Sequence, residues 1–181
     1  NEIGVIQPIA EISARCCAAG VALHTDAVQA FGKVPVSFRE VACTMLTLSG
    51  HKFGAPKGVG ALLVRDRKAV EAIIHGGGQH YGIRPGTENV AGAVALGRAA
   101  QLAATEQEAE ARRLQRLRDR LAERLKSGVS DLVIAGEAGD RAPHVLNVAV
   151  AGADSEALIM HLDLAGVAAS GGSACSTGAV Q

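Results

Sequence analysis

The sequence predicts an α/β fold with a mostly parallel sheet and helices on its faces, followed by part of a smaller α+β domain. In the first half, short apolar runs that end in polar residues alternate with a helical pattern, and a long amphipathic helix is predicted at residues 89–126. Strands that alternate with helices are typical of parallel sheets. With 181 residues, of which 48% are hydrophobic, the chain is long enough to form a real core.

Each expected element rests on a periodicity and on a stop signal. Pro8 fits the first turn of a helix and Gly20 can end it, while short apolar runs indicate buried strands. The expected helices span residues 8–19, 68–74, 89–126 and 155–164. The expected strands span residues 21–25, 41–48, 60–64, 132–135, 145–150 and 167–170. We place a large domain at residues 1–105 and a smaller one at 106–181, with the long helix as the bridge.

Charge and hydropathy exclude several classes of partner. Basic and acidic residues both number 18, so there is no net positive field for nucleic acid or an acidic membrane surface. No apolar run approaches the roughly 20 residues that span a bilayer, and no signal pattern opens the chain, so we expect a cytoplasmic protein. For the charged side chains of the long helix we expect a solvated face with i,i+4 pairs and no chemistry.

Polar side chains follow two of the expected strands. Asp26 ends one, and Ser49, His51 and Lys52 follow the next. In open α/β sheets, ligands usually bind beyond the carboxyl ends of strands. A surface ion pair between Asp26 and Lys52 is an alternative on spacing alone. We also expect His24, two residues before Asp26, to face away from it.

The types of residue at these positions suit pyridoxal phosphate. That cofactor needs an amine to bind its aldehyde, an acid to keep its ring nitrogen protonated, and small donors for its phosphate. Lys52 supplies the amine and would later act as a base, and Asp26 supplies the acid. Ser49 and His51 would bind the phosphate, and Gln29 would donate to the ring oxygen.

One of the four cysteines has a polar setting. Cys175 lies in the run Ser-Gly-Gly-Ser-Ala-Cys-Ser-Thr-Gly at 170–178, where an exposed thiol can ionise, attack and then move. Cys16 and Cys43 occupy apolar patterns and are expected to be structural, whereas Cys17 is left undecided. Neither the cysteines nor the histidines have metal-ligand spacing, so we expect no metal site and no disulfide framework.

These motifs together resemble those of class I cysteine desulfurases, which are pyridoxal-phosphate enzymes of fold type I related to the class-V aminotransferases. The similar runs are 1–4 (Asn-Glu-Ile-Gly), 24–29 (His-Thr-Asp-Ala-Val-Gln), 48–53 (Leu-Ser-Gly-His-Lys-Phe), 56–62 (Pro-Lys-Gly-Val-Gly-Ala-Leu), 76–78 (Gly-Gly-Gly) and 84–89 (Arg-Pro-Gly-Thr-Glu-Asn). The resemblance covers nearly the whole chain. It implies that residues 1–105 belong to the cofactor-binding large domain and that the small domain carries the cysteine loop.

The resemblance also implies an activity and partners. Sulfur would pass from L-cysteine to Cys175 as a persulfide, leaving L-alanine, and then to an iron–sulfur scaffold or another sulfur-acceptor protein. Asn1 matches an asparagine near the cofactor ring. Thr87 matches a threonine that reaches the phosphate of the neighbouring subunit, which implies a homodimer; a helix N-cap before Glu88 is the alternative reading of Thr87.

The chain departs from the family pattern in two places that remove no reacting group. Gly54-Ala55 replaces an aromatic and a glycine, and Gly171 replaces a second serine. The family's other phosphate, ring-stacking and carboxylate-binding residues are missing, so we expect an internal fragment. Three alternatives remain open: a selenocysteine lyase or an aminotransferase of the same fold, or a non-catalytic module that binds a partner protein.

Overall fold

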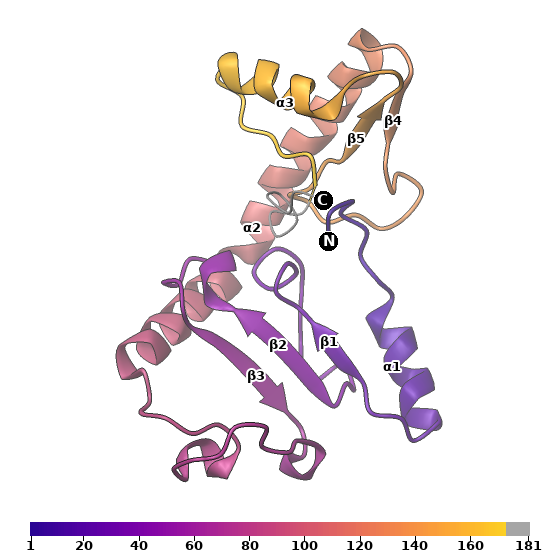
Figure 1. Cartoon of the computed structure of the whole chain (residues 1–181). Coiled ribbons are helices and arrows are strands. Elements are labelled where there is room, and N and C mark those ends of the chain that lie inside the picture. Colours follow the sequence, from indigo (N-terminus) through magenta and orange to yellow (C-terminus); the bar gives the residue numbers. More distant parts are fainter. Residues whose placement is uncertain (173–181) are drawn as a thin grey trace. The chain divides into compact units, whose positions relative to one another are not determined.

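The computed structural model describes residues 1–172 and divides the chain into two compact units (Figure 1). Unit 2 is Gln7–Arg113, and unit 1 combines Asn1–Ile6 with Leu114–Gln181. Helix α2, Val90–Gly128, begins in unit 2 and continues in unit 1. The predicted domains at 1–105 and 106–181 stay a prediction.

Unit 2 is built on a three-stranded sheet with the order β1-β2-β3 (purple in Figure 1). Strand β1, His24–Asp26, runs parallel to β2, Met45–Ser49, while β3, Gly60–Val64, pairs antiparallel with β2. Helix α1, Ile9–Ala18, precedes the sheet. The expected α/β class is confirmed, and of the two strand pairs in this sheet one is parallel.

The core of unit 2 forms where β1 and β2 meet the loop between them. Ala27, Cys43 and Leu46 are almost completely buried, and the surrounding apolar side chains pack against them. Cys43 therefore has the structural position that its apolar pattern predicts. Half-buried neighbours such as Phe38 and Leu63 come from the loop and from β3, so the core joins all three strands.

Arg65, directly after β3, holds the loop that leads into β2. Its guanidinium donates to the carbonyl oxygens of Cys43 at 2.8 Å and Val41 at 2.9 Å. It donates to the carbonyl of Phe38 at 2.5 Å and lies 4.9 Å from the centre of that ring. The Val41 carbonyl also accepts from the Cys43 N–H at 2.7 Å. A single side chain thus ties together several carbonyls of an irregular loop that lies outside the strand ladder.

The connection that follows β3 differs from the expected one. The helix expected at 68–74 is wrong, since a 3₁₀ turn at Arg67–Ala69 is followed by Val70 in an extended conformation. Valine and isoleucine in this stretch disfavour helix through their branched side chains.

Helix α2 starts after Asn89, whose side-chain oxygen accepts from Gly92 N–H at 2.9 Å. Asn89 is thus the N-cap, and the N-cap alternative for Thr87 is wrong.

Unit 1 contains the second half of α2, a two-stranded sheet and a final helix. Strands β4, Leu132–Ile134, and β5, Val148–Val150, are antiparallel, and α3, Ser155–Leu164, is capped by Asp154, which accepts from Ala157 N–H at 2.8 Å. The strand expected at 167–170 is not formed in the described part of the chain. Within residues 1–172, β4 and β5 pair only with each other, so residues 167–170 have no strand partner there.

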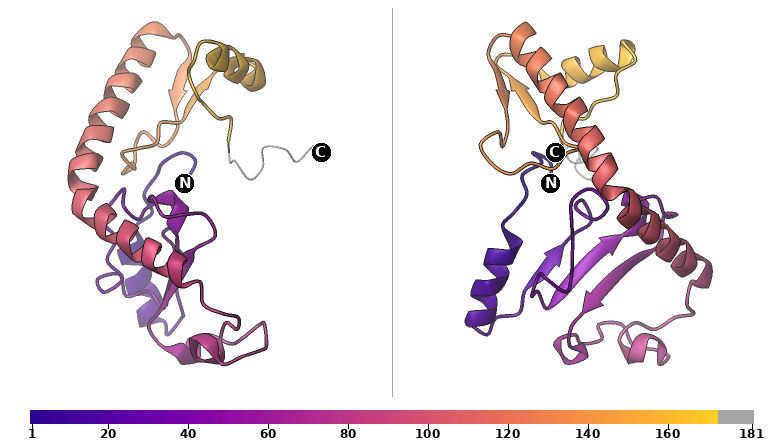
Figure 2. Two further views of the ribbon diagram at one scale, coloured as in Figure 1. Left: turned by 90° about the vertical axis from the view of Figure 1, so that its left-hand side faces the viewer. Right: turned by 180° about the vertical axis from the view of Figure 1, so that it is seen from behind.

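Within residues 1–172, only α2, with 39 residues, has the length needed to cross a bilayer. Figure 2 shows it from two further sides as a continuous helix. Charged residues interrupt its apolar positions throughout its second half. Among residues 1–172, no helix combines the length and the apolar character needed to cross a bilayer.

Replacing Arg65 with methionine should loosen the loop before β2. The Arg65→Met variant loses the guanidinium hydrogen bonds, and we expect the free energy of unfolding to fall by about 1–2 kcal/mol. Urea unfolding followed by circular dichroism measures the change, and hydrogen exchange of amides 38–46 should become faster. Lys68→Met, at an exposed side chain three residues away, is the matched control. Equal stability of the two variants would contradict the role given to Arg65.

Candidate functional site

The parallel pairing of β1 and β2 brings the predicted polar residues to one edge of the sheet. Asp26 is paired in register with Thr47, so Ser49 lies two residues farther along the neighbouring strand. A 3₁₀ turn, Gly50–Lys52, follows at once and carries His51 and Lys52. The structure therefore brings Asp26, Ser49, His51 and Lys52 together, while their chemical roles stay predictions.

Asp26 is exposed, and its carboxylate is oriented by its own backbone. One carboxylate oxygen accepts from the Val28 N–H at 2.8 Å, and the Ala27 N–H donates to the Thr47 carbonyl at 3.0 Å. No salt bridge joins Asp26 to Lys52, so the alternative of a surface ion pair is not formed. The carboxylate is fixed at one oxygen and open at the other.

Ser49 and His51 contact each other across the turn. The Ser49 hydroxyl lies 3.0 Å from Nδ1 of His51, and the direction of that hydrogen bond depends on the imidazole tautomer. Gly50 makes this turn possible, because a Cβ there would lie 2.9 Å from both the Ala55 Cβ and the Leu96 Cδ1. The absence of a side chain at Gly50 thus lets the Ser-Gly-His-Lys run sit close to α2.

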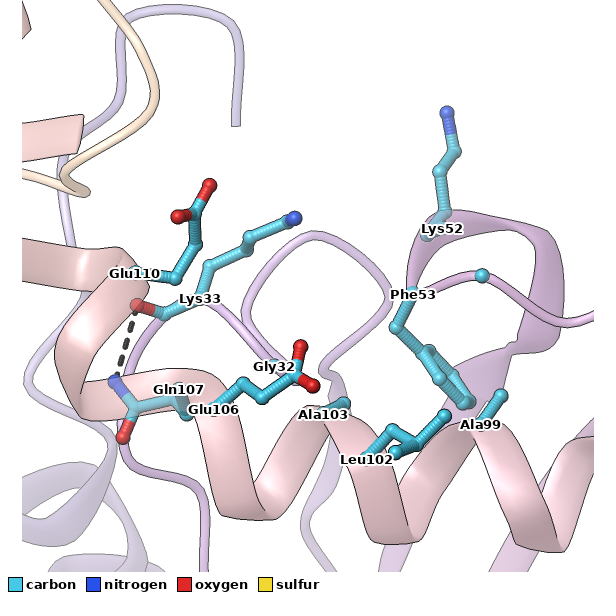
Figure 3. Close-up of a pocket in the computed structure, with 11 residues that line it drawn as sticks. Gly32, Lys33, Lys52, Phe53, Ala99, Leu102, Ala103, Glu106, Gln107 and Glu110 are labelled. Carbon is cyan, nitrogen blue, oxygen red and sulfur yellow. Dashed lines mark hydrogen bonds between the residues drawn. The ribbon is translucent and has the colours of Figure 1, made fainter. Parts of the chain in front are cut away.

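Lys52 and Phe53 point to different sides of the turn (Figure 3). The exposed Lys52 amine points away from α2, and no salt bridge joins it to any residue of 1–172. Phe53 points toward Ala99 and Leu102 of α2, and its ring meets Phe31 edge to face with centroids 4.8 Å apart. Packing of the aromatic side chain anchors the turn and leaves the amine free to react.

An open depression of about 370 Å³ extends from Lys52 along α2. Its lining also includes Lys33, Glu106 and Glu110, which the sequence did not indicate because Lys33 is more than 70 positions from both glutamates. Gln107 fixes one wall by donating to the Lys33 carbonyl at 3.2 Å (Figure 3). Hydrogen bonds from Arg113 hold the pKa of the Glu110 carboxyl below its usual value. We assign no reaction to these side chains.

The other predicted site residues come from different parts of the chain. Gln29 is half-buried and Thr87 exposed, both in unit 2, whereas the exposed Asn1 belongs to unit 1. Cys175 lies outside the described residues. The roles predicted for Asn1, Gln29, Thr87 and Cys175 therefore stay predictions.

The expectation for His24 is wrong. His24 and Asp26 are both exposed, with the less exposed Thr25 between them. Side chains alternate along a strand, so residues two positions apart share a face. His24 therefore lies on the same side of β1 as Asp26.

The thiols differ in their surroundings. Cys43 is fully buried, and burial raises the pKa of its thiol, although Arg65 nearby opposes the effect. Cys16 is half-buried and Cys17 is exposed on α1. No group of three or more potential metal ligands occurs within the described residues 1–172.

Comparison with known proteins identifies the class. The sequence profile of the aminotransferase class-V family matches residues 1–181, so the chain belongs to that family. The chain is 42% identical over its whole length to "Cysteine desulfurase IscS" of Dictyoglomus turgidum, of which it covers 46%. It is 44% identical to a "Cysteine desulfurase" of Gluconacetobacter diazotrophicus, of which it covers 45%. The family resemblance is thus confirmed, and the chain spans about half the length of these curated relatives.

Solved structures agree with the sequence relatives. The fold matches a NifS-like protein from Rickettsia africae with a TM-score of 0.89 and 30% identity, over 95% of this chain and 48% of that one. It also matches a structure described as SspA in complex with cysteine, with a TM-score of 0.70 and 31% identity, over 97% of this chain and 48% of that one.

Thiol alkylation should separate the described cysteines. Iodoacetamide reacts with the thiolate, so burial and a raised pKa should make Cys43 slow relative to the exposed Cys17. Peptide mapping after timed alkylation of the folded chain at about pH 8 should show at least a tenfold difference in rate. In about 6 M guanidinium the difference should vanish, because unfolding removes the burial. Fast labelling of Cys43 in the native chain would contradict its core position.

Proposed function

We propose that this chain supplies part of the cofactor site and the sulfur-accepting cysteine of a pyridoxal-phosphate-dependent cysteine desulfurase. One observation carries the proposal: in a member of the aminotransferase class-V family, Asp26 and the Ser49–Lys52 turn follow neighbouring parallel strands. The similarity to proteins named cysteine desulfurase supports the choice of reaction within that family.

The chemistry of the donor set fits the cofactor. Lys52 offers an exposed primary amine with no salt bridge, which suits attachment to an aldehyde. Asp26 offers a carboxylate for the ring nitrogen, and the Ser49 hydroxyl and His51 imidazole offer donors for a phosphate. When bound, pyridoxal phosphate accepts electrons from the bonds around the amino acid's α carbon.

The chain's own residues then have distinct tasks. The Lys52 amine, once exchanged for the substrate amine, can take and return the proton at the α carbon. The Asp26 carboxylate, oriented by the Val28 N–H, would pair with the ring nitrogen and favour its protonated form. Gln29 would donate its amide to the ring oxygen, and Asn1 would lie near the ring.

Cys175 is proposed to accept the sulfur. Its thiolate attacks the sulfur of the bound L-cysteine, the carbon–sulfur bond breaks, and its electron pair stays with carbon, which takes up a proton. The products are L-alanine and a persulfide on Cys175, so L-cysteine and one thiol are converted with all atoms accounted for. A thiolate is required because the neutral thiol is a poor nucleophile.

The wider setting is also part of the proposal. We infer a homodimer in which Thr87 reaches the phosphate bound by the partner subunit, and a cytoplasmic protein that passes sulfur to an iron–sulfur scaffold or another acceptor. Thr87 is exposed and is not used as the N-cap of α2, so its hydroxyl is available for such a contact. The complex of the similar SspA with cysteine supports L-cysteine as the substrate.

Borohydride trapping tests the cofactor site. Pyridoxal phosphate is added to the 181-residue chain, the adduct is reduced, and peptides are mapped by mass. We expect a stable pyridoxyl group on Lys52, because its amine is exposed and unpaired, and at least about a tenfold loss of labelling in Lys52→Ala. Lys57→Ala, at an exposed lysine five positions away, should label normally. Labelling spread evenly over the lysines of a folded sample would contradict the site.

Product analysis tests the role of Cys175. In a protein of the relatives' full length that carries this chain, Cys175→Ser should keep the cofactor absorbance and lose the persulfide, with alanine formation lowered at least about a hundredfold. Cys17→Ser should behave as the unchanged protein. Sulfide release at the original rate would contradict the role. Keto-acid formation without sulfide would indicate an aminotransferase, and a preference for selenocysteine would indicate a lyase.

A further inference from the structure

The last part of α2 (labelled in Figure 1), residues 114–128, belongs to unit 1. Its sequence has more basic than acidic residues. Its basic residues are Arg116, Arg118, Arg120, Arg124 and Lys126, and its acidic residues are Asp119 and Glu123. The chain as a whole has no net charge, so this segment is locally positive against a neutral background.

Two of these basic side chains hold unit 1 together. Arg118, whose side chain is 11% exposed, donates to the carbonyls of Arg141 at 3.3 Å and Ala142 at 2.9 Å and pairs with Asp119 at 2.7 Å. Lys126 forms a salt bridge with Glu137. Arg118 and Lys126 therefore have contacts within unit 1, whereas the other three basic residues, all arginines, need a separate explanation.

Arg116, Arg120 and Arg124 form a row, which we call the arginine row. All three are exposed, and none has a hydrogen bond, salt bridge or ring contact through its side chain in the described part of the chain. A spacing of four residues in an α-helix gives a rise of about 6 Å and a turn of about 40° per step. The three guanidinium groups thus share one broad face over roughly 12 Å.

Apolar side chains flank the row. Leu117 is 51% exposed and Leu121 is 50% exposed, and each directly follows an arginine of the row. Leu114 and Leu125 are less exposed and lie toward the interior of unit 1. The outer face of α2 therefore offers cations beside exposed leucines, a combination that suits contact with another protein better than contact with water alone.

Helix stability does not explain the row. Like charges four residues apart destabilise a helix, and here two such steps follow each other. Farther up the same helix, Arg112 pairs with Glu108 and Arg113 pairs with Glu110. The expected i,i+4 pairing is thus confirmed at Glu108 and Arg112, and an i,i+3 pair at Glu110 and Arg113 stands beside it. At 116–124 the expectation is wrong, since no i,i+4 salt bridge forms there among the described residues. Glu123, three residues after Arg120, forms no salt bridge with any described residue.

We propose that the arginine row binds an acidic helical segment of another protein, with carboxylates at four-residue spacing and apolar side chains over Leu117 and Leu121. Arginine pairs with carboxylate through two parallel hydrogen bonds, so three cations in a row match three carboxylates repeated at the same pitch. None of the residues of this surface belongs to the proposed cofactor site, and the inference goes beyond the proposed function without depending on it.

Charge and area favour a protein over other polyanions. Three cations over roughly 12 Å neutralise few phosphates, and nucleic acid binding relies on many such contacts. Two half-exposed leucines are also too little apolar surface for a helix that inserts into an interface of lipids. A short acidic segment matches the row in length and has the opposite charge.

Binding of a synthetic peptide tests the inference. The probe is a fluorescein-labelled helical peptide with Glu at every fourth position and Leu beside each Glu, and binding to the 181-residue chain is followed by anisotropy. Changing all three arginines, R116Q/R120Q/R124Q, should weaken binding at least about tenfold, since each exposed pair contributes a few-fold. The triple lysine variant R116K/R120K/R124K should stay within about fivefold of the original chain, since it keeps the charge.

A matched control removes the same charge elsewhere. R15Q/R39Q/K57Q changes three exposed basic residues of unit 2, and its affinity should stay within about twofold of the original chain. Circular dichroism should show unchanged helix content in the glutamine triple, because no described contact is removed. Equal weakening by both triples, or no weakening by the arginine triple, would overturn the inference. Tighter binding of phosphatidylserine vesicles or duplex DNA than of the peptide would overturn the choice of a protein partner.

Discussion

The parallel pairing of β1 with β2 is the constraint on which the candidate site depends. Asp26 and Lys52 are 26 positions apart in sequence, and the register that pairs Asp26 with Thr47 is what brings the two strand ends together. That register is fixed by burial, because Ala27, Cys43 and Leu46 form one core around the strands. A shift by one residue would turn Leu46 toward the opposite face of the sheet.

Contacts between the Ser49–Lys52 turn and α2 then fix the position of the site residues more closely than the strand register does. Gly50 and Phe53 allow the Ser49–Lys52 turn to lie against α2, with the aromatic ring directed inward and the amine outward. Arg65 holds the loop before β2 by donating to the carbonyl oxygens of Val41 and Cys43. The turn that carries the Lys52 amine is therefore held in place by the packing of the neighbouring Phe53, and within residues 1–172 Lys52 itself makes no contact that anchors it. Such an arrangement orients a group without consuming its hydrogen bonds.

Helix α2 serves the two units in different ways. Its first part contributes Leu96, Ala99 and Leu102 to the packing of the turn, and its charges at 108–113 neutralise one another. Its second part uses Arg118 inside unit 1 and leaves the arginine row exposed. Equal totals of basic and acidic residues conceal this division, because net charge is a property of the whole chain and pairing is a property of neighbours.

The sequence by itself determined the α/β class, the strand at Gly60–Val64, the helix at Ser155–Leu164 and the identity of the residues that suit the cofactor. These follow from local periodicity, caps and residue chemistry, which act over a few positions. The tertiary structure was needed to show that β3 is antiparallel, that Arg65 holds a distant loop, and that three arginines lack partners among the described residues. Each of these depends on which distant side chains and strands meet in space, and short-range sequence patterns do not encode those meetings.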